Sequence, residues 1–527
     1  MDRSSKEMMK GAAILTLAAI FSKILSAMYR VPFQNIVGDT GFYIYQQVYP
    51  LYGILLALCT YAFPVMVSKI VAERKQVESK EEIERILQIS SIYLTIVGLV
   101  WFLFLKLGAG AVADWMGDPL LAPLIELMAY PFLLLPVLSV SKGWFQANYN
   151  MIPSAFSQSA EQVVRVLVII IASIVLMSME ASLYDVGKGA VMGSLAGSIT
   201  GVIILLLFLR KQGLSFRMLR SFSFKKGDWT ILRQLTVTGT AMGMGSMMLV
   251  LYQLMDSLNV YSLLVTGGTN GDAAKILKGI YDRGQPLVQM GVVVATSLSL
   301  AVVPIIASAF EDKKSDIVKQ QARLAVKAGV LFGAAAAVGL INIMEPLNIM
   351  LFQDSAGSGV LAVFAAAVLL ASVILTINAV LQGMGDYHLA AWSIVASLFI
   401  KYGLNLLLIP HLQTMGAAIA TVIALLFVMV MVIWKLRQRV GFLLSRIFYL
   451  RLLSGLAGMT IVVQAFLHLP IIAVDSRLVS SVLTLTAVMA GAWVFFKISW
   501  RKGLFSPAEV RQIPLGKKIE RIFGEMT

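Results

Sequence analysis

Two cations interrupt an apolar segment near the start of the chain. Lys23 and Arg30 lie seven residues apart, two turns of an α-helix, so both side chains fall on one helix face about 10 Å from each other. A charge at membrane depth costs about 2.5 to 3.5 kcal/mol on insertion scales, so it should face water or a partner. Together, ammonium and guanidinium groups suit phosphate binding. The alternative is that both snorkel to the membrane interfaces or pair with acids on a neighbouring helix.

Other ionisable residues also interrupt apolar segments. Glu161 and Arg165 are four residues apart and can neutralise each other on a helix surface. Lys401 has no acid within one turn, which favours a functional role. The remaining candidates are Glu126, Asp256, Asp282 and Arg283.

Two of these candidates have open alternatives. Arg283 can face the mouth of a cavity or mark the membrane interface, and Asp256 can be a counter-ion to a cation or a site for a proton or a sodium ion. Taken together, the cations outnumber the acids in the apolar segments by a small margin. A cationic cavity of this kind favours an anionic substrate group.

The elements that carry these residues are predicted to be membrane-spanning helices. The chain has 527 residues, of which 58% are hydrophobic and 13% charged, and its mean hydropathy is +0.83. Too few charges are present to cover a soluble domain of this size. The sequence contains fourteen stretches of about 20 apolar residues, the length that crosses a bilayer. We therefore expect an all-α polytopic membrane protein with about 14 transmembrane helices.

The basic residues predict the orientation of these helices. Of the 43 Lys and Arg, 33 lie in segments on the same side as the N-terminus, 6 in loops on the other side and 4 within spans. This bias predicts a protein of the cell (plasma) membrane with both termini in the cytoplasm. The net charge of +15 follows mainly from the same bias, with possible binding of anionic membrane lipids, and does not indicate nucleic acid.

Weak internal similarity predicts two repeated halves. Pro64 and Pro304 end two spans in similar sequences at an offset of 240, and Gln146 and Gln382 close two others at an offset of 236. Repeats with an even number of spans share one orientation. The expected regions are a six-helix lobe at 1–211, a basic cytoplasmic linker at 212–230, a second six-helix lobe at 231–437, and two further helices with a basic cytoplasmic tail at 438–527.

Motifs of catalysis and of metal binding are not found in the sequence. The three histidines stand singly at the ends of spans, and no nucleophile elbow or nucleotide loop is present. The longest outer loop, about 263–283, is more consistent with a gate or a lid than with a catalytic domain. We expect a non-enzymatic protein without a cofactor or a metal.

Three segments resemble a known family. The segment SKILSAMYRVPFQNIVG at 22–38, the end of the second span AFPVMVSKIVAE and the segment YDRGQPLVQMGVVVATSLSLAVVP at 281–304 are similar to the polysaccharide transporter branch of the multidrug/oligosaccharidyl-lipid/polysaccharide (MOP) exporter superfamily. Within this MATE-like superfamily, the chain most resembles the Gram-positive stage V sporulation protein B group and the MurJ-type lipid II flippases. The flippases are matched at Lys23 after Ser22 and at the pair Asp282 and Arg283. Arg30 is displaced by one residue from their second arginine in the first span, and the acid and the arginine of their second span are not matched.

The resemblance implies a transport function. It implies that two lobes alternate around a cationic cavity and move an undecaprenyl-diphosphate-linked sugar, or a peptidoglycan precursor, from the inner to the outer leaflet. The substrate would serve the synthesis of a polysaccharide or of the cell wall, in vegetative growth or in sporulation. We expect the diphosphate to bind Lys23, Arg30 and Arg283, and Asp256 to be the first candidate for a coupling H⁺ or Na⁺. The alternatives are a multidrug cation antiporter of the same fold and a membrane-embedded glycosyl ligase or polymerase.

Overall fold

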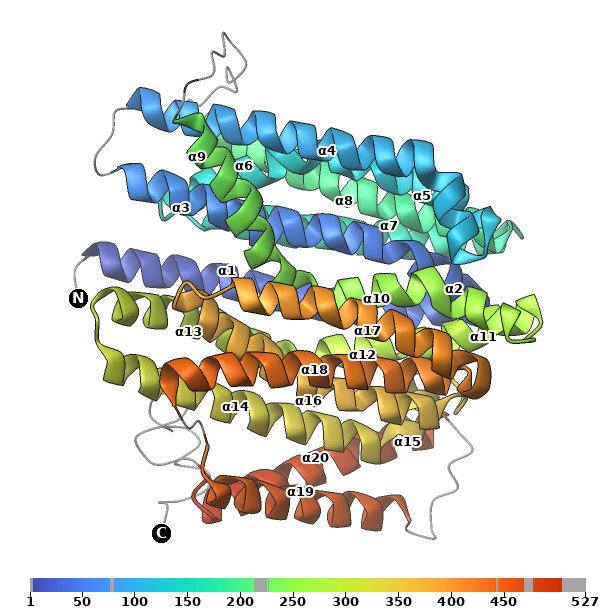
Figure 1. The fold of residues 1–527 in the computed structure, drawn as a ribbon. Coiled ribbons are helices and arrows are strands. Elements are labelled where there is room, and N and C mark those ends of the chain that lie inside the picture. The colour runs from blue at the N-terminus through green and yellow to red at the C-terminus, as the bar shows by residue number, and fades with distance from the viewer. Residues whose placement is uncertain are drawn as a thin grey trace. The chain divides into compact units, whose positions relative to one another are not determined.

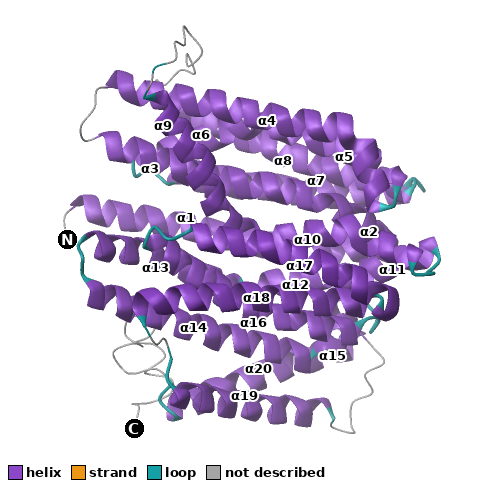
Figure 2. Cartoon of the chain, in the orientation of Figure 1, coloured by secondary structure: helices purple, strands orange, loops and turns teal. Residues whose placement is uncertain are grey.

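The protein is helical throughout the part that the structure describes. The structure is a computed structural model, and it describes residues 3–75, 80–212, 225, 227–441, 444–468 and 477–504. Figure 2 shows helices joined by loops, with no strand among these residues. The all-α prediction is confirmed.

The described residues contain 12 candidate membrane spans, two fewer than the fourteen expected. One difference lies at the start of the chain, where Ile14–Arg74 forms a single helical stretch of 61 residues. The other lies at the expected eighth span, which is divided into α12 (Gly284–Gly291) and α13 (Val293–Glu311) and is not among the 12. The protein is thus a multi-pass membrane protein.

The chain forms two compact units. Unit 1 comprises residues 1–286 and 390–417, and unit 2 comprises 287–389 and 418–527. The boundaries fall within α12, α17 and α18, at other residues than those of the expected halves 1–211 and 231–437, and the repeat stays a prediction. The helices of unit 1 are α1 (Arg3–Met28), α2 (Arg30–Ala57), α3 (Phe63–Lys75), α4 (Lys80–Met116), α5 (Ala122–Ala129), α6 (Leu135–Ala147), α7 (Ile152–Ser178), α8 (Leu183–Lys211), α9 (Asp228–Arg233), α10 (Thr240–Thr266), α11 (Gly271–Asp282) and most of α17 (His388–Leu412).

A bend at Gly38 shapes the first part of unit 1. Gly38 has φ +69° within α2, a left-handed conformation that residues with a side chain rarely adopt. Before the bend, Tyr29 is helical and continues α1 into α2. Figure 1 shows α1 and α3 at one end of unit 1 and α2 at the other, so the chain doubles back within α2. The bend places Asp39 at the start of the returning segment.

Small residues allow close helix contacts in unit 1. A Cβ atom at Gly197 of α8 would lie 2.6 Å from the Glu161 carbonyl of α7. A Cβ atom at Gly279 of α11 would lie 2.2 Å from the Asp39 carbonyl of α2. Helices in membranes associate through such contacts. The segment 263–283, which we expected to be a loop, contains the helix α11. This helix packs on α2, and Gly279 permits the close approach.

Unit 2 consists of further packed helices. They are most of α12, α13, α14 (Ser315–Asn342), α15 (Met344–Phe352), α16 (Ser358–Gly383), most of α18 (Thr414–Val440), α19 (Arg446–Leu467) and α20 (Arg477–Arg501). The helices α14 and α16 meet where Gly333 faces Ser372, with a Cβ at Gly333 only 2.7 Å from the serine Cβ. The final two helices, α19 and α20, pack on each other, on α14 and on α15, around a shared apolar core.

A loop carboxylate in unit 2 is held by two cations of α18. Arg439 Nε donates to Asp386 Oδ2 at 2.5 Å, and Lys435 Nζ lies 3.5 Å from Oδ1. Partial burial raises the pKa of the Asp386 carboxyl, but the hydrogen bond and charge of Arg439, together with Lys435, outweigh it and hold the pKa below its usual value.

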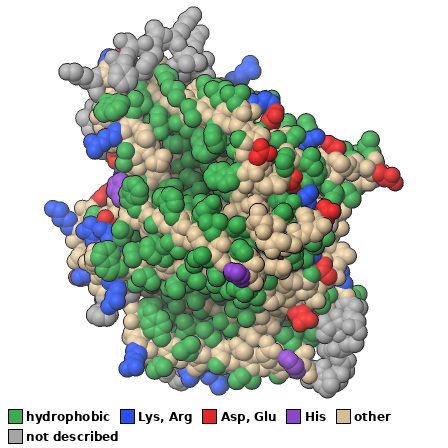
Figure 3. All heavy atoms as spheres, turned by 45° about the vertical axis from the view of Figure 1, so that its right-hand side comes forward, with side chains coloured by type: hydrophobic (Ala, Val, Ile, Leu, Met, Phe, Trp, Pro, Cys, Tyr) green, Lys and Arg blue, Asp and Glu red, His purple; other side chains and the backbone are tan. Residues whose placement is uncertain are grey.

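The surface fits a lipid environment. Figure 3 shows hydrophobic side chains over much of the face in view. Large apolar side chains are exposed on many helices, among them Leu107 at 80% and Leu478 at 75%. So much exposed apolar surface is expected where the solvent is hydrocarbon.

Candidate substrate-binding site

Two arginines of unit 1 are buried among tyrosines. We call Arg30, Arg165, Tyr29, Tyr45, Tyr49 and Tyr52 the arginine–tyrosine cluster. Both arginines are completely buried, and both lie over Tyr49, with 4.3 Å from the Arg30 Cζ and 5.7 Å from the Arg165 Cζ to the ring centroid. Arg165 also lies 5.0 Å from the Tyr52 centroid. Desolvated cation–π contacts of this kind are worth about 2 kcal/mol each.

The donors of these arginines are largely unsatisfied. None of the three Arg30 nitrogens has a hydrogen-bond acceptor among the described residues. Arg165 Nη2 donates to Ser26 Oγ at 3.2 Å, whereas its Nε and Nη1 have no acceptor there. Buried donors without acceptors are rare in proteins and call for water or an anion. The cluster can therefore receive a negatively charged group.

Glu161 and Arg165 do not form the ion pair that their spacing allows. Tyr52 donates to Glu161 Oε1 at 2.9 Å, and Lys142 Nζ lies 3.9 Å from Oε2. The Arg165 guanidinium turns instead to the tyrosine rings of α2. A four-residue spacing brings two side chains within reach, but burial against α2 offers each of them a different partner.

Lys23 lies outside the arginine–tyrosine cluster. Its side chain on α1 is partly buried, and its Nζ is 6.0 Å from the ring centroid of Tyr61. No hydrogen bond or ion pair of Lys23 occurs among the described residues. Lys23 and Arg30 thus differ in environment, although they share one side of a nearly continuous helix.

Arg283 forms a bidentate ion pair with Asp39. Its Nε donates to Oδ1 at 2.9 Å and its Nη2 to Oδ2 at 2.6 Å. Arg283 is completely buried, whereas 16% of the Asp39 side chain is exposed. Gln34 Nε2 also donates to Asp39 Oδ1, at 2.9 Å across the bend in α2. Because Gln34 is one turn after Arg30, polar side chains continue from Arg30 to Arg283.

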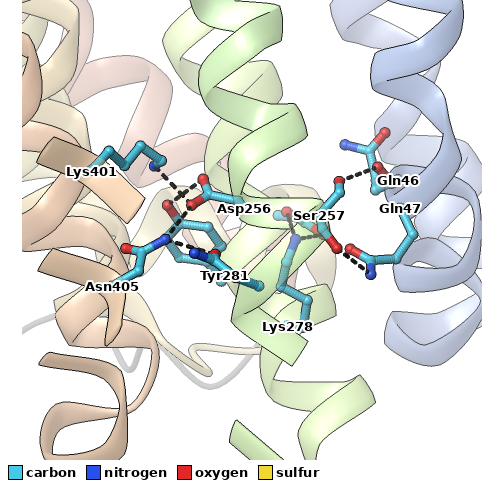
Figure 4. A network of polar contacts seen from close by, with 10 residues as sticks. Gln46, Gln47, Asp256, Ser257, Lys278, Tyr281, Lys401 and Asn405 are labelled. Carbon is cyan, nitrogen blue, oxygen red and sulfur yellow. Dashed lines mark hydrogen bonds and ion pairs between the residues drawn. The ribbon is translucent and has the colours of Figure 1, made fainter. Parts of the chain in front are cut away.

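A second polar group surrounds Asp256 on α10, and Figure 4 shows it. Lys401 Nζ lies 2.7 Å from Asp256 Oδ1, and Tyr281 donates to Oδ2 at 3.0 Å. Asn405, one turn after Lys401 on α17, donates to Asn259 at 2.9 Å. We call Asp256, Lys401, Tyr281, Asn405 and Asn259 the Asp256 network. Asp256 and Asn259 are 1% and 3% exposed, and the other three residues are wholly buried.

Two further contacts lie in the same region, one within α11 and one between α2 and α10. Lys278 Nζ lies 2.6 Å from Asp282 Oδ1, and both side chains are completely buried. Gln47 on α2 donates to the Ser257 carbonyl on α10 at 3.0 Å, as Figure 4 shows. Asp282 is therefore neutralised by Lys278 on its own helix, and Arg283 by Asp39 on α2.

Glu126 belongs to none of these groups. Its carboxylate pairs with Lys106 at 2.5 Å, and 41% and 35% of the two side chains are exposed. An exposed pair of this kind contributes little to stability. The structure does not bring Glu126 together with the other candidates.

Sequence analysis did not single out several residues that complete these groups. They include Asp39, Lys142 and Lys278, which are not among the candidates named from the sequence. One signal was available for the tyrosines, because Tyr45, Tyr49 and Tyr52 recur at intervals of four and three and so share one helix face.

The fold resembles those of two membrane proteins of known structure. A solved structure of lipid II flippase MurJ in the inward closed conformation matches with a TM-score of 0.67 at 14% identity, covering 92% of this chain and 99% of that one. An inward-facing multidrug resistance MATE family transporter of the MOP superfamily matches with a TM-score of 0.65 at 14% identity, covering 81% and 98%. These likenesses establish a MurJ- and MATE-like fold.

The chain belongs to the polysaccharide biosynthesis protein family, whose model matches residues 8–310. The uncharacterized membrane protein YabM of Bacillus subtilis (strain 168) is 40% identical over 97% of this chain and 96% of that protein. Lipid II flippase MurJ of the same organism is 23% identical over 97% and 98%. The chain is therefore a multi-pass membrane protein of this family with a MurJ- and MATE-like fold.

The sporulation proteins named in the expected resemblance are more distant relatives than YabM. Stage V sporulation protein B of Bacillus subtilis (strain 168) is 26% identical over 80% of this chain and 82% of that protein. YabM is considerably more similar over nearly the whole length. The sporulation proteins are thus relatives of this chain, at a lower identity than YabM.

Proposed function

We propose that the protein is a flippase that moves a polyprenyl-diphosphate-linked oligosaccharide or peptidoglycan precursor from the inner to the outer leaflet by alternating access. The observation that carries the proposal is the pair of completely buried arginines with unsatisfied donors. A diphosphate supplies several acceptor oxygens and compensating negative charge. The similarity to a protein named as a lipid II flippase supports a lipid-linked substrate for wall or polysaccharide synthesis.

The diphosphate binds Lys23, Arg30 and Arg283 in this proposal. Arg165 contacts the same Tyr49 ring as Arg30 and adds to the positive potential. Arg283 exchanges the Asp39 carboxylate for a phosphate when substrate binds, since both anions fit its bidentate donors. The sugar occupies water, and the polyprenyl tail stays in lipid.

The membrane topology in this proposal has fourteen crossings. The stretch Ile14–Arg74 is long enough for two crossings and bends at Gly38, and α12 with α13 supplies one more beyond the 12 candidates. An even number puts both termini on the cytoplasmic side, as the distribution of Lys and Arg favours. Two six-helix lobes then rock about the substrate site.

An ion gradient biases the two states through the Asp256 network. The Asp256 carboxylate is held by the Lys401 ammonium, so a proton or a sodium ion has to compete with this tethered cation. Such competition changes the charge between α10 and α17 and provides the difference in free energy that a conformational switch requires.

A multidrug cation antiporter is the second candidate, because the MATE fold is shared. It requires an acidic cavity, whereas among the described residues the charged atoms without a hydrogen-bond partner belong to Arg30, Lys142 and Arg165, with one carboxylate oxygen, Glu161 Oε2. A glycosyl ligase or polymerase is disfavoured, since the fold is that of transporters.

Reconstitution of the wild-type protein in proteoliposomes distinguishes these functions. We expect a labelled polyprenyl-diphosphate oligosaccharide to become accessible in the opposite leaflet at a protein-dependent rate, and a cationic dye not to be extruded. Extrusion of the dye without movement of the lipid would contradict the flippase function and favour the cation antiporter. Formation of a new glycosidic product from the lipid-linked donor would indicate the ligase.

A further inference from the structure

Unit 2 contains a cavity of 240 Å³ at one end of three helices. It is lined by Arg323 and Lys327 of α14, by Ser445, Phe448 and Arg451 at the start of α19, and by residues just after the end of α20. Figure 1 shows the starts of α14 and α19 at the same end of unit 2. None of the residues named here takes part in the candidate substrate-binding site.

The cavity has a strongly positive electrostatic character. Three cations line it, and no Asp or Glu is found among its described lining residues. The N-terminus of the 22-residue helix α19 adds partial positive charge, and Ser445 caps it by accepting from the Phe448 amide at 3.2 Å. Arg451 Nη1 donates to the Gly503 carbonyl at 2.8 Å, which leaves the other guanidinium N–H groups for a ligand. A phosphate group fits this arrangement.

Apolar surface continues from the cavity along α19. Ile447, which lines the cavity, is 59% exposed, and Leu450 and Leu453 are 63% and 60% exposed on the same side of the helix. Residues at intervals of three form one stripe of a helix. The cationic cavity thus joins a surface suited to acyl chains.

We propose that this cavity binds the headgroup of an anionic phospholipid, whose acyl chains lie along the apolar stripe of α19. The phosphodiester binds Arg323, Lys327 and Arg451 and connects α14 with the pair formed by α19 and α20. Basic pockets between transmembrane helices on the cytoplasmic side bind such headgroups. The expected orientation puts the start of α19 on that side.

The test uses the full-length protein in detergent and short-chain dioctanoyl phosphatidylglycerol, with binding followed by native mass spectrometry. Arg323→Ala and Arg451→Ala are the variants. Arg446→Ala is the matched control, because Arg446 is an exposed cation at the same end of α19 but does not line the cavity. Arg323→Ala keeps the test valid if Arg451→Ala disturbs the contact with Gly503, since Arg323 is exposed.

We expect saturable binding that each cavity variant weakens about fivefold and that Arg446→Ala leaves unchanged, as one charge near a lipid surface contributes about that factor. Dioctanoyl phosphatidylcholine should bind more weakly, because its headgroup has no net charge. Equal loss in all three variants would reduce the effect to general surface charge and overturn the proposal. Displacement of the bound lipid by inorganic phosphate at equal concentration would show that the cavity binds a soluble phosphate, and it would overturn the proposal that a lipid is the ligand.

Discussion

The ion pair between Asp39 and Arg283 gives the sharpest prediction for stability. Asp39→Asn keeps the shape of the side chain but removes its charge, which leaves the completely buried Arg283 without a counter-ion. Loss of one partner of a buried pair costs about 3 to 5 kcal/mol. Partial exposure of Asp39 and the remaining amide oxygen reduce this cost, so we expect a loss of about 2 to 3 kcal/mol in the free energy of unfolding.

A double-mutant cycle measures the pair itself. Asp39→Asn, Arg283→Met and the double variant are unfolded in SDS titrations, and we expect a coupling energy of about 1 to 3 kcal/mol. The matched control is the cycle of Lys106→Met with Glu126→Gln, whose half-exposed pair should give less than about 1 kcal/mol. A coupling energy for Asp39 and Arg283 no larger than that of the control would refute the claim that the two side chains form a buried ion pair.

The same variant reports on substrate binding. If a diphosphate displaces Asp39 from Arg283, removal of the competing carboxylate should strengthen binding of a short-chain prenyl diphosphate by about tenfold, in line with about 1.5 kcal/mol for a charged hydrogen bond. Isothermal titration of wild type and Asp39→Asn measures the change. Weaker binding by Asp39→Asn would contradict this exchange, while the double-mutant cycle would still stand.

Further variants test other contacts. Gly279→Ala should lower the melting temperature, because its Cβ would lie 2.2 Å from a backbone oxygen of α2, whereas Gly110→Ala, with nothing within 4 Å, should be neutral or gain up to about 1 kcal/mol; equal melting temperatures would exclude the close approach. Lys401→Met should lose about 3 to 5 kcal/mol by leaving Asp256 unpaired, and Asp256→Asn added to it should restore most of the loss, as unfolding titrations would reveal. Since the pKa of Asp386 is lowered on folding, its contribution to stability is present above its unfolded pKa of about 3.9 and is lost as the pH falls through the folded pKa. Asp386→Asn should therefore flatten the decrease in melting temperature below about pH 4, and an unchanged decrease would count against this contribution.

Most of the fold could be predicted from the lengths of the apolar stretches and from the distribution of charged residues along the chain. Stretches of about 20 apolar residues define helices almost regardless of context, because backbone groups in lipid have to be bonded within the segment. The bend at Gly38 is a local choice of a left-handed conformation, and the sequence shows a glycine there without showing whether the chain turns. The helix at 271–282 was missed because its polar residues suggested a loop, whereas contacts with α2 bury one face of it.

The cations were predictable as candidates, but their partners were not. A Lys or Arg in an apolar stretch stands out by composition alone, as Arg30 and Lys401 do. The counter-ions come from other helices: Asp256 for Lys401, and Asp39 for Arg283 across 244 residues. Such pairings depend on tertiary packing, which periodicity within one helix does not encode.

Flipping by the Arg30→Met variant is the most direct test of the substrate site. Arg30→Met removes the cation–π contact with Tyr49 but also a buried charge without a hydrogen bond to a described residue, so the two effects should offset and the melting temperature should change little. Movement of a labelled polyprenyl-diphosphate oligosaccharide across proteoliposomes should nevertheless fall to the protein-free rate, with Glu126→Gln as the control that keeps wild-type flipping. Wild-type flipping by a folded Arg30→Met protein would contradict the assignment of the buried arginines to the diphosphate.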